Sequence, residues 1–339
     1  MKLAIHKGSS TFHDRWIAYC INNSISYKLV DCHSNDLISN LKDCHALMWH
    51  FHQGNIRDNL IAKQIIFALS HVNFVVFPDF RTSWHFNDKL GQKYLFEAIG
   101  APFVPTYIFY KKNEALRWAE QTIFPKVFKL RVGASSENVN IVKTKAECLK
   151  IIRIAFSKGF AKYNVINNIK DRFLKFGRTN FSIFDLLKGF LRLAYPPIYS
   201  RLGSRERGYV YFQDFIDNNE FDIRVVVIGS RAFALKRFNR PNDFRASGSG
   251  NFSYEKEIFD IRCIKIAFEI AKKLELQMVA FDFIFNQLGS PLIVEISYGF
   301  VSEVYDPCVG YWDDKLNWHE GFTVKEDWMV ELVLEQCRR

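Results

Sequence analysis

The sequence has no uncharged apolar run of about 18 residues, the length that a membrane-spanning helix needs. Residues 1–6 are too short in apolar length for a secretory signal and predict a first β-strand instead. The seven cysteines are odd in number and form no C-x-x-C pair, which excludes a disulfide framework and a typical zinc site. We therefore expect a cytoplasmic protein with reduced thiols.

The net charge is +10, but most of the chain has little excess of positive over negative charge. The segment from Lys158 to Arg207 carries eleven basic residues against three acidic ones and supplies most of this excess. The basic character is local, so the composition does not support a general nucleic-acid-binding surface. The length of 339 residues is enough for two or three domains.

Strand and helix signals alternate over the first 80 residues. A helical stretch covers residues 56–69, and the strand candidates are residues 3–6, 27–31, 46–51 and 74–77. This alternation predicts a small open parallel sheet with helices on its faces.

The rest of the chain divides around a basic, Phe-rich segment without a clear period. A helix is expected at 87–99, with Asn87 or Asp88 as its cap, and another at 255–274. We predict an N-terminal α/β domain, an α+β subdomain, an insertion and a second α+β subdomain, with the boundaries 1–85, 86–156, 157–207 and 208–339.

Two carboxylates interrupt apolar strands near the C-terminus. Asp282 lies in a strand predicted at 278–285, and Glu295 lies in one predicted at 291–297. Alternation places Glu295 and Ser297 on one strand face, and a hairpin can bring Asp282 beside them. Such oxygen donors suit magnesium. The alternative is a buried salt bridge to Arg or Lys.

A second pattern is a lysine-bearing strand followed by a loop of small residues, Val132 to Val139. Alternation places Lys126 and Lys129 on opposite strand faces, so only one of them can face a ligand. A lysine and backbone N–H groups of Gly133, Ser135 and Ser136 can hold phosphates. A surface lysine before an ordinary turn gives the same pattern.

A third pattern is the segment Gln213-Asp214-Phe215, followed by Asp222. A strand end can offer backbone groups to an adenine edge, and a carboxylate can accept from ribose hydroxyls. An exposed acidic turn is the alternative.

In chain order these patterns resemble the ATP-grasp superfamily, which includes D-alanine–D-alanine ligases, glutathione synthetases and ribosomal-protein glutamate ligases. The resemblance runs from about residue 87 to 300 and implies an ATP-grasp fold, in which two α+β subdomains after an N-terminal α/β domain clasp ATP. It implies that Lys89 and Lys129 contact the phosphates and that residues 133–139 form a lid.

The resemblance also implies roles for the remaining site residues. Gln213, Asp214 and Phe215 would line the adenine pocket, and Asp222 would hold the ribose. Arg237 would face the phosphates or the acyl phosphate, and Arg245 a substrate carboxylate. Asp282, Glu295 and Ser297 would hold one or two magnesium ions, with manganese as a substitute; Ser297 stands where the family usually has Asn.

The expected function is that of an ATP- and magnesium-dependent ligase. By resemblance, it would activate a carboxylate as an acyl phosphate and join it to an amine, for example an amino acid to a sugar acid or a peptide. The alternative is a catalytically weak ATP-binding protein or adaptor, whose basic insertion binds an anionic glycan or the inner membrane face. The oligomeric state stays open, a homo-oligomer included.

Two further features keep two interpretations each. Arg224 lies in an apolar strand and predicts either a structural ion pair or a ligand contact. His50 and His52 lie at the end of the third predicted strand, and strand ends of α/β sheets bind ligands. A histidine pair in an aromatic run is also typical of ordinary packing.

Overall fold

The computed structural model describes residues 1–8, 11–133, 138–161, 205–240 and 243–339. Ser135, Ser136 and most of the predicted insertion lie outside these ranges, and so does the hypothesis of an anionic surface bound by that insertion. Within them, no helix has both the length and the apolar character that a bilayer crossing requires. All seven cysteines are free thiols.

The N-terminal unit is a four-stranded parallel sheet, as the alternation predicted. Its order is β2 (Ser26–Val30), β1 (Lys2–His6), β3 (Ala46–Met48) and β4 (Val75–Phe77). Its helices are α1 (Thr11–Asn22), α2 (Leu37–Leu41), α3 (Ile56–His71) and α4 (Phe80–Ser83). Strand β3 ends before the predicted Phe51, because the N–H of Phe51 donates to the carbonyl of Trp49 at 2.9 Å and turns the chain.

A second, antiparallel four-stranded sheet follows α5 (Lys89–Ile99). Asp88 caps α5 by accepting from the N–H of Gly91, and Gly100 ends it in the left-handed region at φ 65°. The sheet order is β5 (Thr106–Phe109), β8 (Val210–Asp214), β6 (Lys126–Lys129) and β7 (Asn140–Val142). Helices α6 (Lys112–Gln121) and α7 (Lys145–Ala155) pack on one of its faces, which leaves the other face for a site.

The third sheet is seven-stranded. Its order is β13 (Pro291–Ser297), β12 (Met278–Phe285), β9 (Phe221–Ile228), β10 (Arg231–Phe238), β14 (Gly310–Asp313) and β15 (Trp318–Glu320), and β11 (Phe252–Ser253) pairs with β10. Helix α11 (Ile261–Lys273) packs on one face, and α12 (Lys325–Arg338) packs against the N-terminal core.

Helix α11 begins later than the sequence predicted. The expected start at Glu255 is wrong, because residues Lys256–Ile258 form a separate 3-10 turn. The side chain of Asp260 then caps the helix by accepting from the N–H of Arg262 at 2.9 Å.

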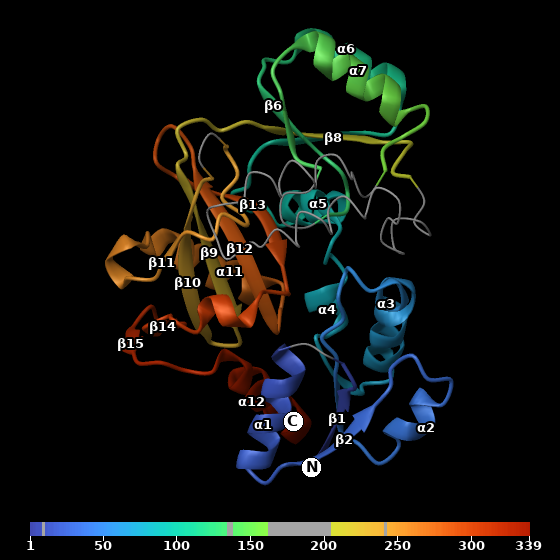
Figure 1. The fold of residues 1–339 in the computed structure, drawn as a ribbon, viewed down its shortest axis with the longest axis vertical. Helices are drawn as coiled ribbons and strands as arrows, with labels where there is room; N and C mark the ends of the chain where they lie inside the picture. The colour runs from blue at the N-terminus through green and yellow to red at the C-terminus, as the bar shows by residue number, and fades with distance from the viewer. Residues whose placement is uncertain (9–10, 134–137, 162–204, 241–242) are drawn as a thin grey trace, which may run out of the picture.

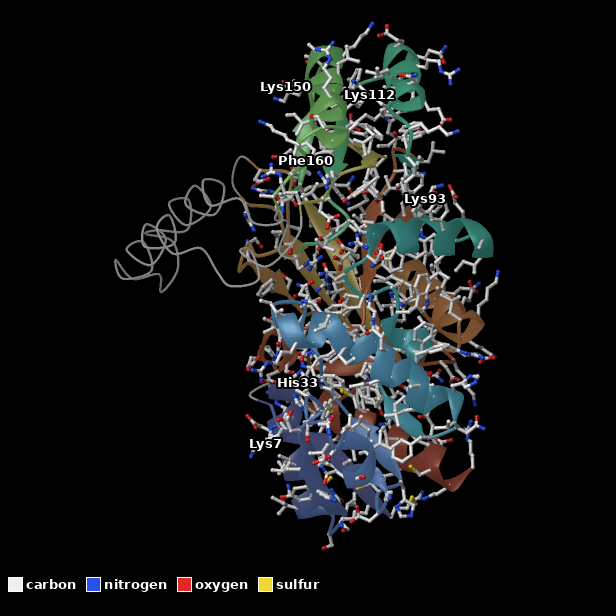
Figure 2. All side chains as sticks on the ribbon, turned by 90° about the vertical axis from the view of Figure 1, so that its right-hand side faces the viewer. Lys7, His33, Lys93, Lys112, Lys150 and Phe160 are labelled. Carbon is white, nitrogen blue, oxygen red and sulfur yellow. The ribbon has the colours of Figure 1, made fainter. Side chains whose placement is uncertain are left out.

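The three sheets follow one another along the long axis of the molecule (Figure 1). The sheet that carries α6 and α7 is at the top, the seven-stranded sheet lies below it, and the N-terminal unit is at the bottom with both chain ends. Figure 2 shows Lys112 and Lys150 at one end and Lys7 and His33 at the other. A parallel sheet followed by two α+β parts confirms the predicted fold class; the domain boundaries stay predictions.

Candidate functional site

A cavity of about 500 Å³ lies where the three parts meet. All predicted site residues within the described ranges line it: Lys89, Lys129, Gly133, Gln213, Asp214, Phe215, Asp222, Arg237, Arg245, Asp282, Glu295 and Ser297. The structure therefore brings together residues that are far apart in the sequence.

The floor of the cavity is one face of the seven-stranded sheet. Asp282 on β12 is directly opposite Arg224 on β9, and Asp222 on β9 is opposite Arg237 on β10. Asp222 and Arg224 are two residues apart in one strand, so their side chains share a face. Strand register thus builds a patch of alternating charge.

A β-bulge joins Glu295 to this patch. The β12–β13 register pairs Phe283 with Ile293 but Asp282 with Glu295, so Val294 is an extra residue. Without it, Asp282 would be opposite Val294, and Glu295 would be on the other face of the sheet. The bulge is therefore what sets the two carboxylates side by side, as bulges near functional sites commonly do.

The buried charges on this floor are paired. Arg224 binds both carboxylate oxygens of Asp282, with N–O distances of 2.5 and 2.8 Å. Arg237 binds both oxygens of Asp222 at 2.6 and 2.7 Å, and its Nη2 also lies 3.0 Å from Asp282. Burial raises the pKa of Asp282, but the two guanidinium groups outweigh it and hold the pKa well below its ordinary value.

Lys89 reaches the same carboxylates from α5. Its buried Nζ lies 2.9 Å from Oε1 of Glu295 and donates to the carbonyl of Gly133 at 3.0 Å. The side chain of Gln92 fixes α5 to β13 by bonding the backbone N–H and C=O of Ile296 at 3.2 and 2.8 Å. The position of Lys89 is thus determined by helix packing, rather than by a flexible loop.

Lys129 comes from the opposite wall. Its Nζ donates to Oε1 of Gln213 at 2.6 Å. Burial lowers its pKa to about 8, although the Glu295 carboxylate pulls the other way. Lys126 does not line the cavity and is paired with Asp214 at 2.5 Å, so only one lysine of this strand faces the site, as alternation predicted.

The loop after β6 is tied to the cavity wall at Gly133. Its N–H donates to Oδ1 of Asn87 at 2.8 Å, and its carbonyl accepts from Lys89. Gly133 has φ 136°, a conformation that other residues rarely adopt. Asn87 was expected only as a possible cap of α5, and no pattern in the sequence marks its contact with Gly133. Its φ is 57°, a conformation that Asn adopts more readily than most residues.

The end of β8 provides a mixed polar and apolar wall. The amide of Gln213 donates to the hydroxyl of Thr106 at 3.1 Å, which fixes its orientation between β5 and Lys129. The ring of Phe215 packs edge-on against Phe244 at 5.8 Å. Apolar side chains complete the lining nearby: Val127, Val139, Ile284 and Val294.

Oxygen donors suited to magnesium lie at the hairpin. Asp282 and Glu295 are direct cross-strand neighbours, and the hydroxyl of Ser297 bonds the backbone of Gly299 at 3.0 and 3.1 Å. Over the described ranges, no group of three or more His, Cys, Asp and Glu side chains is arranged to hold a metal. Two carboxylates and a hydroxyl fit a hard cation that takes its other ligands from phosphates and water.

Arg245, Arg224 and the histidines also border the cavity. Arg245 is held by Asp243, with its Nε 2.9 Å and its Nη2 2.7 Å from Oδ2. Arg224, for which two interpretations were open, forms the ion pair and lines the cavity as well. His50 and His52 lie on the wall formed by the N-terminal unit.

Comparisons with known proteins concern the fold that carries this cavity. Residues 203–303 match a family model described as a RimK-like ATP-grasp domain. A RimK domain ATP-grasp protein from Sphaerobacter thermophilus is 13% identical, with TM-score 0.58 over 98% of this chain and 100% of that one. The D-alanine–D-alanine ligase of Bacillus anthracis, complexed with ATP, is 13% identical, with TM-score 0.57 over 100% and 97% of the chains.

The ATP-grasp ligase PsnB, complexed with a minimal precursor, Mg and ADP, is 10% identical, with TM-score 0.56 over 100% and 98% of the chains. No curated protein sequence matches this chain. At such identities the structural likeness establishes the fold alone. The chain has the ATP-grasp fold, and its residues 203–303 are similar to a RimK-like ATP-grasp domain.

Proposed function

We propose that this chain is an ATP- and magnesium-dependent ligase that activates a carboxylate as an acyl phosphate and joins it to an amine. ADP and phosphate are released. The observation that carries the proposal is the arrangement of Lys89, Glu295 and Asp282 as successive partners on the floor of one cavity, with Lys129 on the facing wall. Cations and hard oxygen donors in one partly enclosed space match the needs of phosphoryl transfer.

The residues on different walls of the cavity would bind different parts of the nucleotide. Lys89 and Lys129 would neutralise the phosphates, and Gln213, Asp214 and Phe215 would border the adenine beside the apolar lining. Asp222 would hold the ribose. A carboxylate has about four lone-pair sites, and two remain after the bidentate bond to Arg237.

Asp282, Glu295 and Ser297 would hold magnesium, which supplies charge neutralisation of the phosphate oxygens. Arg237 and Arg245 would orient the substrate carboxylate toward the γ-phosphate. Such positioning can contribute roughly 7–11 kcal/mol to lowering the barrier. Residues 133–139 would exclude water from the acyl phosphate.

The proposed ligase activity is tested by screening candidate carboxylates with a trapping nucleophile. Purified protein is incubated with ATP, Mg²⁺ and a panel of amino acids, sugar acids and peptides, with hydroxylamine present to trap an acyl phosphate as a hydroxamate. We expect ADP and hydroxamate in equal amounts with one class of carboxylate. Glu295→Gln should abolish both while the circular dichroism spectrum is retained, whereas the exposed Glu320→Gln should match the parent.

ADP formation by Glu295→Gln at the parent rate would show that the metal assignment is wrong. A second candidate function, nucleotide binding without turnover, is favoured by one observation: Asp282 already binds two arginines. Tight ATP binding with no hydroxamate across the whole panel would establish that function instead.

A further inference from the structure

The end of the cavity at the N-terminal unit differs from the phosphate-facing part. An aromatic cluster surrounds it, in which the ring of Phe12 stacks on His50 at 4.1 Å and meets Phe300 edge-on at 4.9 Å. Phe86 packs against Tyr298 at 4.6 Å, and His50, Phe86 and Phe300 line the cavity itself. A ligand at this end of the cavity would therefore contact the faces and edges of aromatic rings.

His50 presents a neutral imidazole there. Its buried Nδ1 has no hydrogen-bond partner among the described residues, and burial lowers the pKa of the His50 side chain to about 3. The ring is fixed by the stack with Phe12 rather than by an ion pair. A neutral imidazole retains one lone pair that can accept a hydrogen bond.

Gly299 leaves open the space in front of His50. A Cβ built at Gly299 would lie 3.6 Å from Nε2 of His50 and 3.7 Å from Cε2 of Phe86, which are ordinary contact distances. Its backbone is outside the left-handed region, so the conformation does not require glycine. The missing side chain thus keeps a small gap between the imidazole and the Phe86 ring, two residues after Ser297.

The distribution of charge separates the two ends. The cations of the cavity lie on α5, β6, β9, β10 and the loop after β10: Lys89, Lys129, Arg224, Arg237 and Arg245. Among the described residues, those before Lys89 that line the cavity carry no fixed charge: His50, His52, Gln53, Phe86 and Asn87. A substrate carboxylate belongs with the cations, and a group bound at the aromatic end meets no charged side chain in this described part of the cavity lining.

We infer that His50, Phe86 and Gly299 form the subsite for the attacking amine, and that this amine is uncharged and carries an aromatic or other apolar group. The inference rests on the proposed ligase function. His50 accepts a hydrogen bond from the amine N–H, and the Phe86 ring covers the apolar group. The amine nitrogen then attacks the acyl carbon, phosphate leaves, and the displaced amine proton passes to solvent.

Three amines test the class of the attacking amine, because two of them each differ from the third, phenylalanine amide, in a single group. Phenylalanine amide, phenylalanine and glycine amide are compared at about pH 9, above the ordinary pKa of an α-amino group. With the carboxylate that gives the hydroxamate, phenylalanine amide should show the highest kcat/KM, by about tenfold. Equal or better use of phenylalanine or of glycine amide would overturn the inference.

Variants test the residues. Gly299→Ala should lower kcat/KM for phenylalanine amide by about tenfold, because its methyl group fills the gap. It should lower the hydroxylamine-trapped rate by a much smaller factor, since that nucleophile is small. His50→Phe keeps the ring stack but removes the acceptor, and should raise KM for the amide more than it lowers kcat. Gly8→Ala, at another glycine with ordinary neighbour distances, is the matched control.

Equal losses with both nucleophiles, or no loss in Gly299→Ala, would refute the assignment. If no hydroxamate forms at all, the proposed function fails, and the existence of the subsite is then tested by ligand binding. Phenylalanine amide should then raise the Tm of the parent chain more than phenylalanine does, and more than it raises the Tm of Gly299→Ala. Equal shifts would refute the subsite.

Discussion

At the scale of single residues, each buried charge on the floor of the cavity depends on a named partner. Asp222 has Arg237, whereas Asp282 has both Arg224 and Arg237. Removing one member of a buried pair costs more than the pair contributes, because it leaves a charge without compensation. These pairs also hold the carboxylate of Asp282 and the guanidinium of Arg237 in fixed positions for a ligand.

Arg237→Met should lower the free energy of unfolding by about 3–5 kcal/mol, because Asp222 is then buried without its partner. Urea denaturation followed by circular dichroism measures the change. Arg339→Met, which breaks the exposed pair with Glu335, is the control and should leave stability unchanged. A loss in Arg237→Met no larger than in the control would contradict this view of the network.

Lys129 makes nucleotide affinity depend on pH. Its pKa lies at about 8, so its ammonium charge is present below that pH and is lost as the pH rises through it. The affinity for ATP should therefore fall between about pH 7 and 9, as calorimetric titration can measure. Lys129→Met should bind more weakly with a flat profile, and a parallel slope in both proteins would exclude Lys129 as the cause.

The sequence could predict many of the residues that line the cavity, because a charge inside an apolar strand is costly and is therefore a signal. It could not predict their partners. Arg224 kept two interpretations because its pairing with Asp282 depends on the register between β9 and β12, which are far apart in the chain. Asn87 was missed because its bond to Gly133 exists only in the folded chain.

At the scale of elements, the β12–β13 hairpin shows where pattern reasoning ends. The bounds of both strands agree with those predicted, since apolar residues and a Gly-containing turn mark them. The bulge at Val294 was not predicted, because an extra residue is visible only in the pairing of two strands. The late start of α11 could have been found from Asp260, a good N-cap residue.

The first turn of helix α12 contains an unfavourable, partly buried negative charge. Burial, with Glu326 and Glu331 nearby, raises the pKa of Asp327 to about 6. The folded state therefore binds a proton more tightly than the unfolded state, and this contribution to stability is lost as the pH rises from about 4 through 6.

Asp327→Asn should raise the free energy of unfolding by about 1 kcal/mol at pH 7, a value reduced by solvent screening of this part-exposed side chain, and should change little at pH 4. Denaturant titrations at both pH values measure the effect. The exposed Asp314→Asn is the control. An equal gain at both pH values would show that the charge of Asp327 is not the cause.

At the scale of the whole molecule, one cavity draws on all three sheets. Contacts between residues far apart in the chain hold it together, such as that of Gln92 with Ile296, 204 positions away. Periodicity predicts elements but not such contacts, so the assembly of the site came from the resemblance to ATP-grasp proteins. The order of the motifs was sufficient to predict the fold. The aromatic end of the cavity, by contrast, could be recognised only in the structure.

The most direct measurement of the central claim is the affinity for ATP with and without Mg²⁺, for the parent chain and for Glu295→Gln. If Asp282, Glu295 and Ser297 hold the metal against the phosphates, Mg²⁺ should tighten ATP binding to the parent by about tenfold or more. Glu295→Gln should lose that gain and keep its fold. An ATP affinity that is indifferent both to Mg²⁺ and to Glu295 would contradict the account.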